Sequence, residues 1–294
     1  MVSEALTAIT YSPVTEARPI LLRLYKYYDN AGVKLDAGAD LRIAILSALL
    51  PIAEPQDQVL AEHAATTYEF MPPQREECAS GLRAAGLVLL SNLDPVLASY
   101  HCTRLLVDVY TSSMSGEPAV SAIQILARQV SHLPYQGHLL PLYSYILDQH
   151  ECIPEVEAEC LRQLVKAPPT IVDTVISHYN ALIPIGTGIP VPRHRTKDDV
   201  VLLGLFDLVL TFPKRSTCLS CIENFLRETQ RDEIYHYLLT TIIANHSPQF
   251  WNVLLEVARD ERRPEKVELL LSALTLVPHN PALEKLIREL QQKK

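Results

Sequence analysis

The chain of 294 residues is 48% hydrophobic and 20% charged, a balance that is typical of a packed globular protein and excludes a disordered one. Its net charge of −8 argues against a protein that binds nucleic acid through the phosphates, because such binding requires a basic face. The 9 glycines and 21 prolines favour helices punctuated by proline over a β-rich fold with many tight turns.

Apolar residues recur at helical spacing along most of the chain. Leu21, Leu22 and Leu24 open the first predicted helix, and Asp40 is placed to cap a second one at Leu41–Ala53. Further helices are predicted at about 56–70, 73–92, 95–112, 118–131, 135–149, 154–167 and 169–181, and after a break at about 199–211, 213–229, 231–245, 248–260, 264–277 and 281–292. No pair of strands is predicted.

Several predicted helices begin with a capping residue followed by proline. Asp94-Pro95, Ser247-Pro248 and Asn280-Pro281 each place a hydrogen-bond acceptor before a residue that is tolerated at the first helical position. These pairs are the clearest local signals for where a helix starts.

The spacing of proline starts indicates a structural repeat. Pro73, Pro95, Pro118, Pro134 and Pro154 are separated by 22, 23, 16 and 20 residues, which suits a repeated unit of one helix and a short turn. A pair of antiparallel helices cannot bury its apolar face alone, so neighbouring pairs are expected to stack into an elongated core.

The segments around these starts resemble HEAT and armadillo-type repeats over Asp40–Lys166. The similar segments are Asp94-Pro95-Val96; Glu117-Pro118-Ala119-Val120 with Ala122 and Leu126; Ile153-Pro154-Glu155-Val156 with Ala158 and Leu161; and Asp40-Leu41-Arg42 with Ala44. Only Arg42 provides the basic residue that HEAT repeats often carry in their second helix. The resemblance implies an all-α fold, a right-handed α-solenoid of stacked antiparallel helix pairs.

The segment Ile183–Lys197 interrupts the helices with three prolines and two glycines and is predicted to be an extended loop. It would divide the chain into an N-terminal helical-repeat stack at residues 1–182 and C-terminal helical hairpins at residues 198–294 that continue the stack. Its basic residues form either a solvated linker or a contact for an acidic partner. They are Arg193, His194, Arg195 and Lys197.

The six cysteines are scattered through helical patterns, and Met1–Thr10 lacks the basic and apolar regions of a signal peptide. We therefore expect reduced thiols and a cytoplasmic protein. The uncharged stretches Gln129–Leu147 and Thr174–Pro192 contain prolines and histidines, so we expect no membrane insertion.

Candidate chemical sites are few. The Cys218–Cys221 pair has CxxC spacing, but a zinc site needs two more ligands and the pair lies in a helical pattern, so it is interpreted as core. His150-Glu151 has the order that di-iron HEAT-repeat hydroxylases use several times, whereas Glu62-His63 has the reverse order. We therefore predict no catalytic, metal-binding or cofactor-binding residue.

The pattern favours a non-enzymatic helical-repeat scaffold or adaptor that binds another protein through a concave face. The alternative is an enzyme or enzyme subunit on a HEAT-like scaffold, either metal-dependent or acting on a nucleic-acid base like the HEAT-like alkylation-repair glycosylases. The acidic net charge and the single tryptophan, Trp251, argue against an enzyme that acts on a nucleic-acid base.

Overall fold

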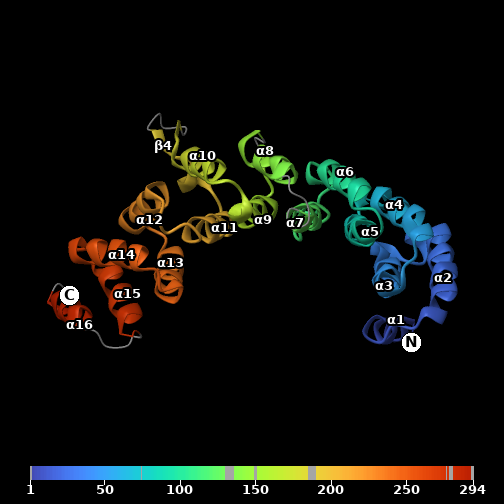
Figure 1. The fold of residues 1–294 in the computed structure, drawn as a ribbon, viewed down its shortest axis with the longest axis horizontal. Coiled ribbons are helices and arrows are strands. Elements are labelled where there is room, and N and C mark those ends of the chain that lie inside the picture. The colour runs from blue at the N-terminus through green and yellow to red at the C-terminus, as the bar shows by residue number, and fades with distance from the viewer. Residues whose placement is uncertain are drawn as a thin grey trace. The chain divides into compact units, whose positions relative to one another are not determined.

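The computed structural model describes residues 2–73, 75–129, 136–148, 151–184, 190–275, 277 and 281–292. These residues form sixteen α-helices and two sheets of two short strands each (Figure 1). The predicted all-α fold class is confirmed. Pro134 and His150, which the sequence singled out, lie outside the described residues.

The helices and strands follow one another without long gaps in the described chain. The helices are α1 (Val2–Tyr11), α2 (Arg18–Ala31), α3 (Asp40–Leu49), α4 (Gln58–Thr66), α5 (Ser80–Leu93), α6 (Pro95–Leu106), α7 (Ala119–Gln129), α8 (Leu140–Asp148), α9 (Pro154–Gln163), α10 (Pro169–Asn180), α11 (Asp199–Leu210), α12 (Ser216–Glu228), α13 (Asp232–Asn245), α14 (Pro248–Asp260), α15 (Pro264–Leu274) and α16 (Pro281–Gln291). The strands are β1 (Phe70–Met71), β2 (Glu76–Glu77), β3 (Leu182–Pro184) and β4 (Pro190–Pro192). Short 3-10 helices lie at Thr15–Ala17, Gly32–Lys34, Ala37–Ala39, Leu50–Ile52, Pro55–Asp57, Gln136–Leu139, Leu164–Lys166 and Arg193–Thr196.

The chain divides into two compact units, residues 1–159 (unit 1) and residues 160–294 (unit 2). In unit 1, α5 packs against α4 and α6, and the alternate helices α3, α5 and α7 also contact one another. In unit 2, each helix likewise contacts the next alternate helix. One series is α11 with α13 and α13 with α15, and the other is α10 with α12, α12 with α14 and α14 with α16. The segment predicted to separate two stacks, Ile183–Lys197, lies within unit 2.

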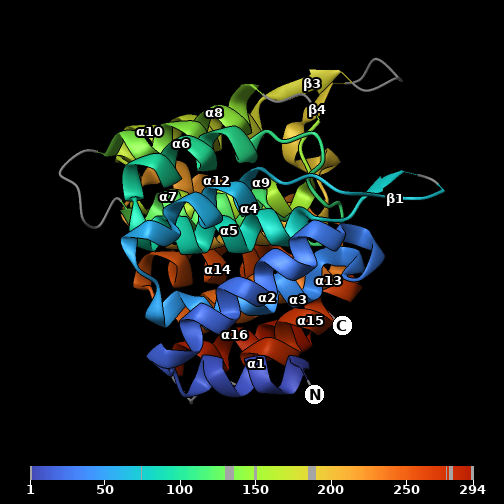
Figure 2. The ribbon, with the colours of Figure 1, turned by 90° about the vertical axis from the view of Figure 1, so that its right-hand side faces the viewer.

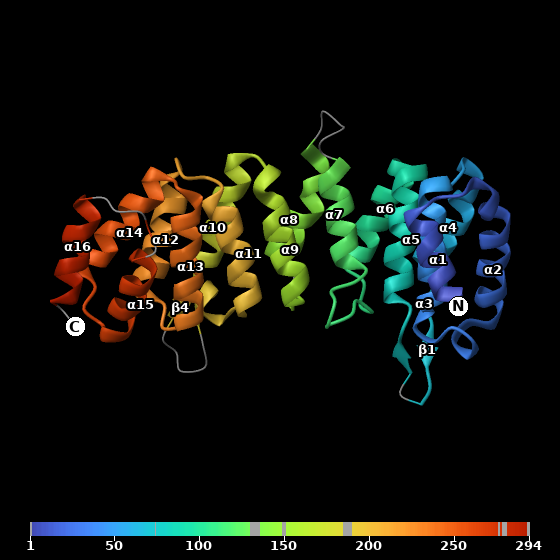
Figure 3. The ribbon, with the colours of Figure 1, turned by 90° about the horizontal axis from the view of Figure 1, so that it is seen from below.

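Two short hairpins occupy positions where the sequence predicted a helix or a loop. β1 pairs with β2 where a helix was predicted from residue 73, and β3 pairs with β4 inside the predicted loop. Both predictions are wrong at these residues, because prolines that exclude a helix are still compatible with short strands at an edge. The β1–β2 hairpin extends past the ends of the unit 1 helices (Figures 2 and 3).

The helix starts agree only in part with the predicted caps. The Asp94 carboxylate accepts hydrogen bonds from the N–H groups of Val96 (3.1 Å) and Leu97 (2.9 Å), as predicted. Ser247 makes no capping hydrogen bond, and Asn280 lies outside the described residues. Asp40 is already helical, and the carboxylate of Asp36 instead accepts from the first N–H groups of α3.

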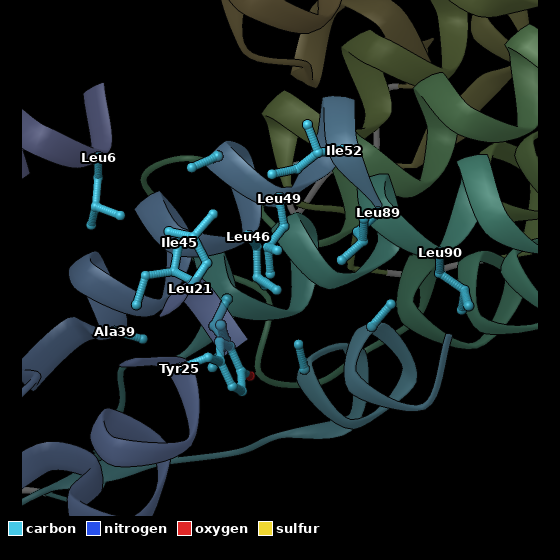
Figure 4. Close-up of a cluster of buried hydrophobic side chains, with 14 of the residues drawn as sticks. Leu6, Leu21, Tyr25, Ala39, Ile45, Leu46, Leu49, Ile52, Leu89 and Leu90 are labelled. Atoms are coloured by element: carbon cyan, nitrogen blue, oxygen red, sulfur yellow. The ribbon is translucent and has the colours of Figure 1, made fainter. Parts of the chain in front are cut away.

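A hydrophobic core joins the first helices of unit 1 (Figure 4). Leu21 and Tyr25 of α2 lie among Ile45 and Leu46 of α3, each at most 1% exposed. Leu90 of α5, also fully buried, extends the same cluster. These residues recur at helical spacing, which brings them to the covered faces of their helices.

Two fully buried arginines, Arg42 of α3 and Arg83 of α5, hold this unit together. Arg42 donates to Asp36 (3.0 Å) and to both oxygens of Glu69 (2.7 Å each). Burial alone would lower the pKa of Arg42, but these carboxylates raise it, so the guanidinium stays charged.

The Arg83 network repeats the Arg42 network 41 residues later in the chain. Arg83 donates to Glu77 (2.6 and 3.1 Å) and to the carbonyl oxygen of Tyr110 (3.1 Å). Each arginine lies six residues after its acidic partner and 27 residues before a second acceptor. Arg83 therefore has the same sequence spacing to its partners as Arg42, and the resemblance of Arg42 to the basic position of HEAT repeats stays a prediction.

Candidate protein-binding surface

The solvent side of α6 carries apolar side chains where a surface helix ordinarily carries charged ones. Val96 is 82% exposed, Tyr100 is 63% exposed, and Val107, just after the helix ends, is 52% exposed. With Thr103 these residues are spaced by four, three and four positions, which places them on one face. None of the four is charged, which is unusual for the solvent side of a surface helix.

The neighbouring helix α4 lies beside this apolar face and adds one exposed apolar residue, Val59. Polar contacts join the two helices at three levels: Gln58 to Asp94 (3.3 Å), Glu62 to His101 (3.2 Å) and the Ala65 carbonyl to Arg104 (3.1 Å). The order of these contacts shows that α4 and α6 run parallel, with Figure 1 showing them side by side.

This pairing puts Val59 of α4, which is 76% exposed, at the same end as Val96 of α6. We call Val59, Val96, Tyr100 and Val107 the α4–α6 face. The flanking helix α2 adds two more exposed apolar residues, Ile20 and Tyr27. It is tied to α4 by the pairing of Arg18 with Asp57.

An aromatic cluster lies where α4 and α6 end. The rings of Phe70 and Tyr110 are 5.3 Å apart, and those of Tyr68 and Tyr110 are 5.7 Å apart. The Arg83 guanidinium lies 4.2 Å from the Tyr68 ring, whose hydroxyl donates to Asp108 (3.0 Å). Because the buried network holds this cluster in place, Phe70 and Tyr110 remain partly exposed without being loose.

Exposed apolar residues are unevenly distributed over the described parts of the chain. Sixteen of the seventeen large hydrophobic side chains that are exposed lie in unit 1, and Leu182 is the single one in unit 2. Within unit 1, α1 packs against α3 and exposes Val2 and Tyr11, whereas α3, α5 and α7 expose small or polar residues. These are Asp40, Ser47, Asn92, Gln124 and Arg128. Five of the exposed large hydrophobic residues of unit 1 lie on α2, α4 and α6, and they are Ile20, Tyr27, Val59, Val96 and Tyr100.

The predicted partner contact at Arg193, His194, Arg195 and Lys197 forms a short helical turn in unit 2. His194 is only 5% exposed, and its ring lies 4.3 Å from that of Phe225. Arg195 pairs with Glu228, and the Lys197 ammonium lies 5.9 Å from the Tyr179 ring. The structure thus gathers these residues against α10 and α12, and their contact with a partner stays a prediction.

The residues considered for chemistry take part in packing and helix-to-helix contacts. Cys218 and Cys221 are buried in α12, and burial raises the pKa of their thiols to about 11 and about 12. Glu62 contacts His101, and His63 contacts Asp29 at 3.0 Å. Within the described ranges, no group of three or more His, Cys, Asp or Glu side chains is arranged to hold a metal ion.

Sequence reasoning missed the α4–α6 face because apolar residues at helical spacing ordinarily indicate a core. A usable signal was present: α6 is apolar on two opposite sides. Ala98, Cys102 and Leu105 are buried, while Val96 and Tyr100 point the other way. Packing against one neighbour accounts for only one of these two apolar sides of α6, so the second apolar side was the signal for an exposed apolar face.

None of the helices in the described residues has the length and apolar character needed to cross a lipid bilayer. No family model, curated protein or solved structure matches this chain.

Proposed function

We propose that this protein is a non-enzymatic helical-repeat scaffold or adaptor that binds another protein through the α4–α6 face. The observation that carries the proposal is the uncharged, exposed stripe of Val96, Tyr100 and Val107 on α6. Contiguous apolar surface of this kind, rimmed by polar residues, marks protein interaction sites. Tyr100 is the expected anchor, because tyrosine is enriched among the residues that dominate interface energies.

We further propose that the helices form a right-handed α-solenoid of the HEAT type. Two features of the chain support this arrangement. The Arg42 and Arg83 networks repeat with the same internal spacing, and alternate helices contact one another in each unit. In such an array each pair contributes one helix to each of two rows, and a binding surface extends over several repeats.

The exposed apolar residues on α2, α4 and α6 favour this row of helices for the contact. The charge of unit 1 adds a second criterion for the partner. Residues 1–159 carry 19 acidic and 9 basic side chains, whereas residues 160–294 carry 15 and 17. A partner segment that combines apolar side chains with basic residues would complement this unit.

A pull-down with quantitative mass spectrometry tests the proposal. The intact chain should retain a stoichiometric partner, and the Val96→Ser/Tyr100→Ser double variant should lose it. Both substitutions are at exposed positions, so the melting temperature should stay within a few degrees of wild type. Leu182→Ser, an exposed apolar position in unit 2, is the matched control and should keep the partner.

Retention of the partner by the double variant would contradict the proposed surface. Stoichiometric metal in the purified protein, without a protein partner, would favour the enzymatic alternative.

A further inference from the structure

A small pocket in unit 2 lies beside the turn Arg193–Thr196 and is separate from the α4–α6 face. Its volume is about 250 Å³, and its walls come from that turn, from α11 and from the end of α12. Leu202 and Phe225, each 3% exposed, supply the apolar part of the lining. His194, Arg195, Glu228 and Arg231 supply the polar part.

The hydrogen bonding of His194 fixes which of its nitrogens is open. Its Nδ1 lies 3.2 Å from the carbonyl oxygen of Tyr179, and since a carbonyl can only accept, Nδ1 carries the hydrogen. Burial lowers the pKa of His194, so the ring is neutral near pH 7. Nε2 is then a bare acceptor, and it has no hydrogen-bond partner among the residues that the structure describes.

The charged groups of the pocket satisfy one another. Arg195 pairs with Glu228, and Arg231 pairs with Asp199 (2.6 Å) and also donates to the carbonyl oxygens of Lys197 (2.9 Å) and Arg195 (3.2 Å). An ionic ligand would have to break one of these pairs. The pocket therefore suits a neutral group that is mainly apolar and offers one hydrogen-bond donor to His194.

The volume restricts that group to a single ring system, because pockets for complete small-molecule ligands occupy roughly 300–1,000 Å³. We propose that this pocket binds the side chain of a tyrosine or tryptophan, whose hydroxyl or indole N–H donates to Nε2 of His194. The ring lies against Phe225 and Leu202, and the guanidinium groups of Arg195 and Arg231 at the rim contact its face. This inference rests on the proposed function in one respect, which is that a partner protein supplies the tyrosine or tryptophan side chain.

Binding of small amides to the full chain tests the pocket without the partner. N-acetyl-L-tyrosinamide and N-acetyl-L-tryptophanamide should bind at least about tenfold more tightly than N-acetyl-L-phenylalaninamide, because only the first two can donate a hydrogen bond to Nε2 of His194. Calorimetry or ligand-observed NMR gives the affinities. In protein with ¹⁵N-labelled histidine, the Nε2 resonance of His194 should shift on addition of the tyrosine amide.

His194→Phe removes the acceptor and keeps a ring against Phe225, so it should bind the tyrosine and phenylalanine amides equally. His236→Phe makes the same change at an exposed histidine of α13 and should preserve the preference. If His194→Phe does not fold, the comparison of the three amides on the wild-type chain still tests the proposed pocket.

Equal affinity for the three amides, or no binding of any of them at millimolar concentration, would overturn the inference. Selective binding together with loss of the partner only in the Val96→Ser/Tyr100→Ser variant would separate the two sites. If the amides bind selectively but no protein partner is found, the preference of the pocket for a ring with a hydrogen-bond donor is supported, and the claim that a partner protein supplies this ring is contradicted.

Discussion

The charged state of the buried residue Glu261 is stabilised by hydrogen-bond donors of its own turn. Glu261, at the turn between α14 and α15, is 6% exposed and accepts hydrogen bonds from the Arg263 guanidinium (2.8 and 2.5 Å) and from the N–H groups of Arg262 and Arg263 (3.0 Å each). Burial raises the pKa of Glu261, but these hydrogen bonds outweigh it and lower the pKa from 4.5 to about 2.

This shift gives the free energy of unfolding a defined dependence on pH. Since the pKa is lower in the folded state, the contribution of Glu261 is complete above about pH 4.5 and is lost as pH falls towards 2. The loss should amount to at most about 3 kcal/mol. Urea unfolding at a series of pH values measures it. Glu261→Gln should be less stable than wild type at pH 7 and should lose less on acidification.

The exposed Glu256→Gln in α14 is the matched control, with the same chemical change outside this network. It should keep the wild-type slope between pH 4.5 and 2. If Glu261→Gln and Glu256→Gln have the same slope, the carboxylate of Glu261 does not carry the acid sensitivity.

At the scale of one element, α7 illustrates how a helix in this protein is stabilised mainly by the side it buries. Leu126 is 1% exposed and lies on the face that α7 turns towards α5 and α6, whereas Gln124 is exposed on the same helix. Leu126→Ala should therefore cost about 2–5 kcal/mol, because it removes buried methyl groups and leaves a cavity. Gln124→Ala should change stability by less than about 0.5 kcal/mol.

Thermal and urea unfolding of the two α7 variants provide the comparison. A cost below about 1 kcal/mol for Leu126→Ala would mean that the site collapses around the smaller side chain or that the contact is looser than the burial indicates.

At the scale of the whole molecule, a mutation that destabilises unit 1 can change the stability of unit 1 alone or of both units. Arg42→Ala leaves Asp36 and Glu69 without their buried partner and should destabilise unit 1 by about 3–5 kcal/mol. The single tryptophan, Trp251 in α14, reports only on unit 2. In a helical repeat array, stability is a sum of local and nearest-neighbour contributions, so the two units should respond unequally.

Urea unfolding followed by circular dichroism and by Trp251 fluorescence tests this expectation. In Arg42→Ala the dichroism should show an earlier transition, while the fluorescence midpoint should move less. Arg23→Ala, at an exposed position of α2, should leave both midpoints in place. Equal shifts of the two signals in Arg42→Ala would show that the units unfold as one cooperative body.

The amino-acid sequence by itself determined the helical class and the cap at Asp94. These features depend on the spacing of apolar residues and on hydrogen bonds within one helical turn, which are local properties of the chain.

Only the tertiary structure decided which apolar faces remain uncovered and which polar groups meet. Tyr100 and Ala98 belong to the same helix, and nothing in their spacing tells which one a neighbouring helix covers. His194 is buried by Phe225, 31 residues later, and the Arg83 guanidinium reaches the Tyr110 carbonyl across 27 residues. Contacts of such separation depend on how helices pack, because burial is set by the neighbours of a side chain and not by its own segment.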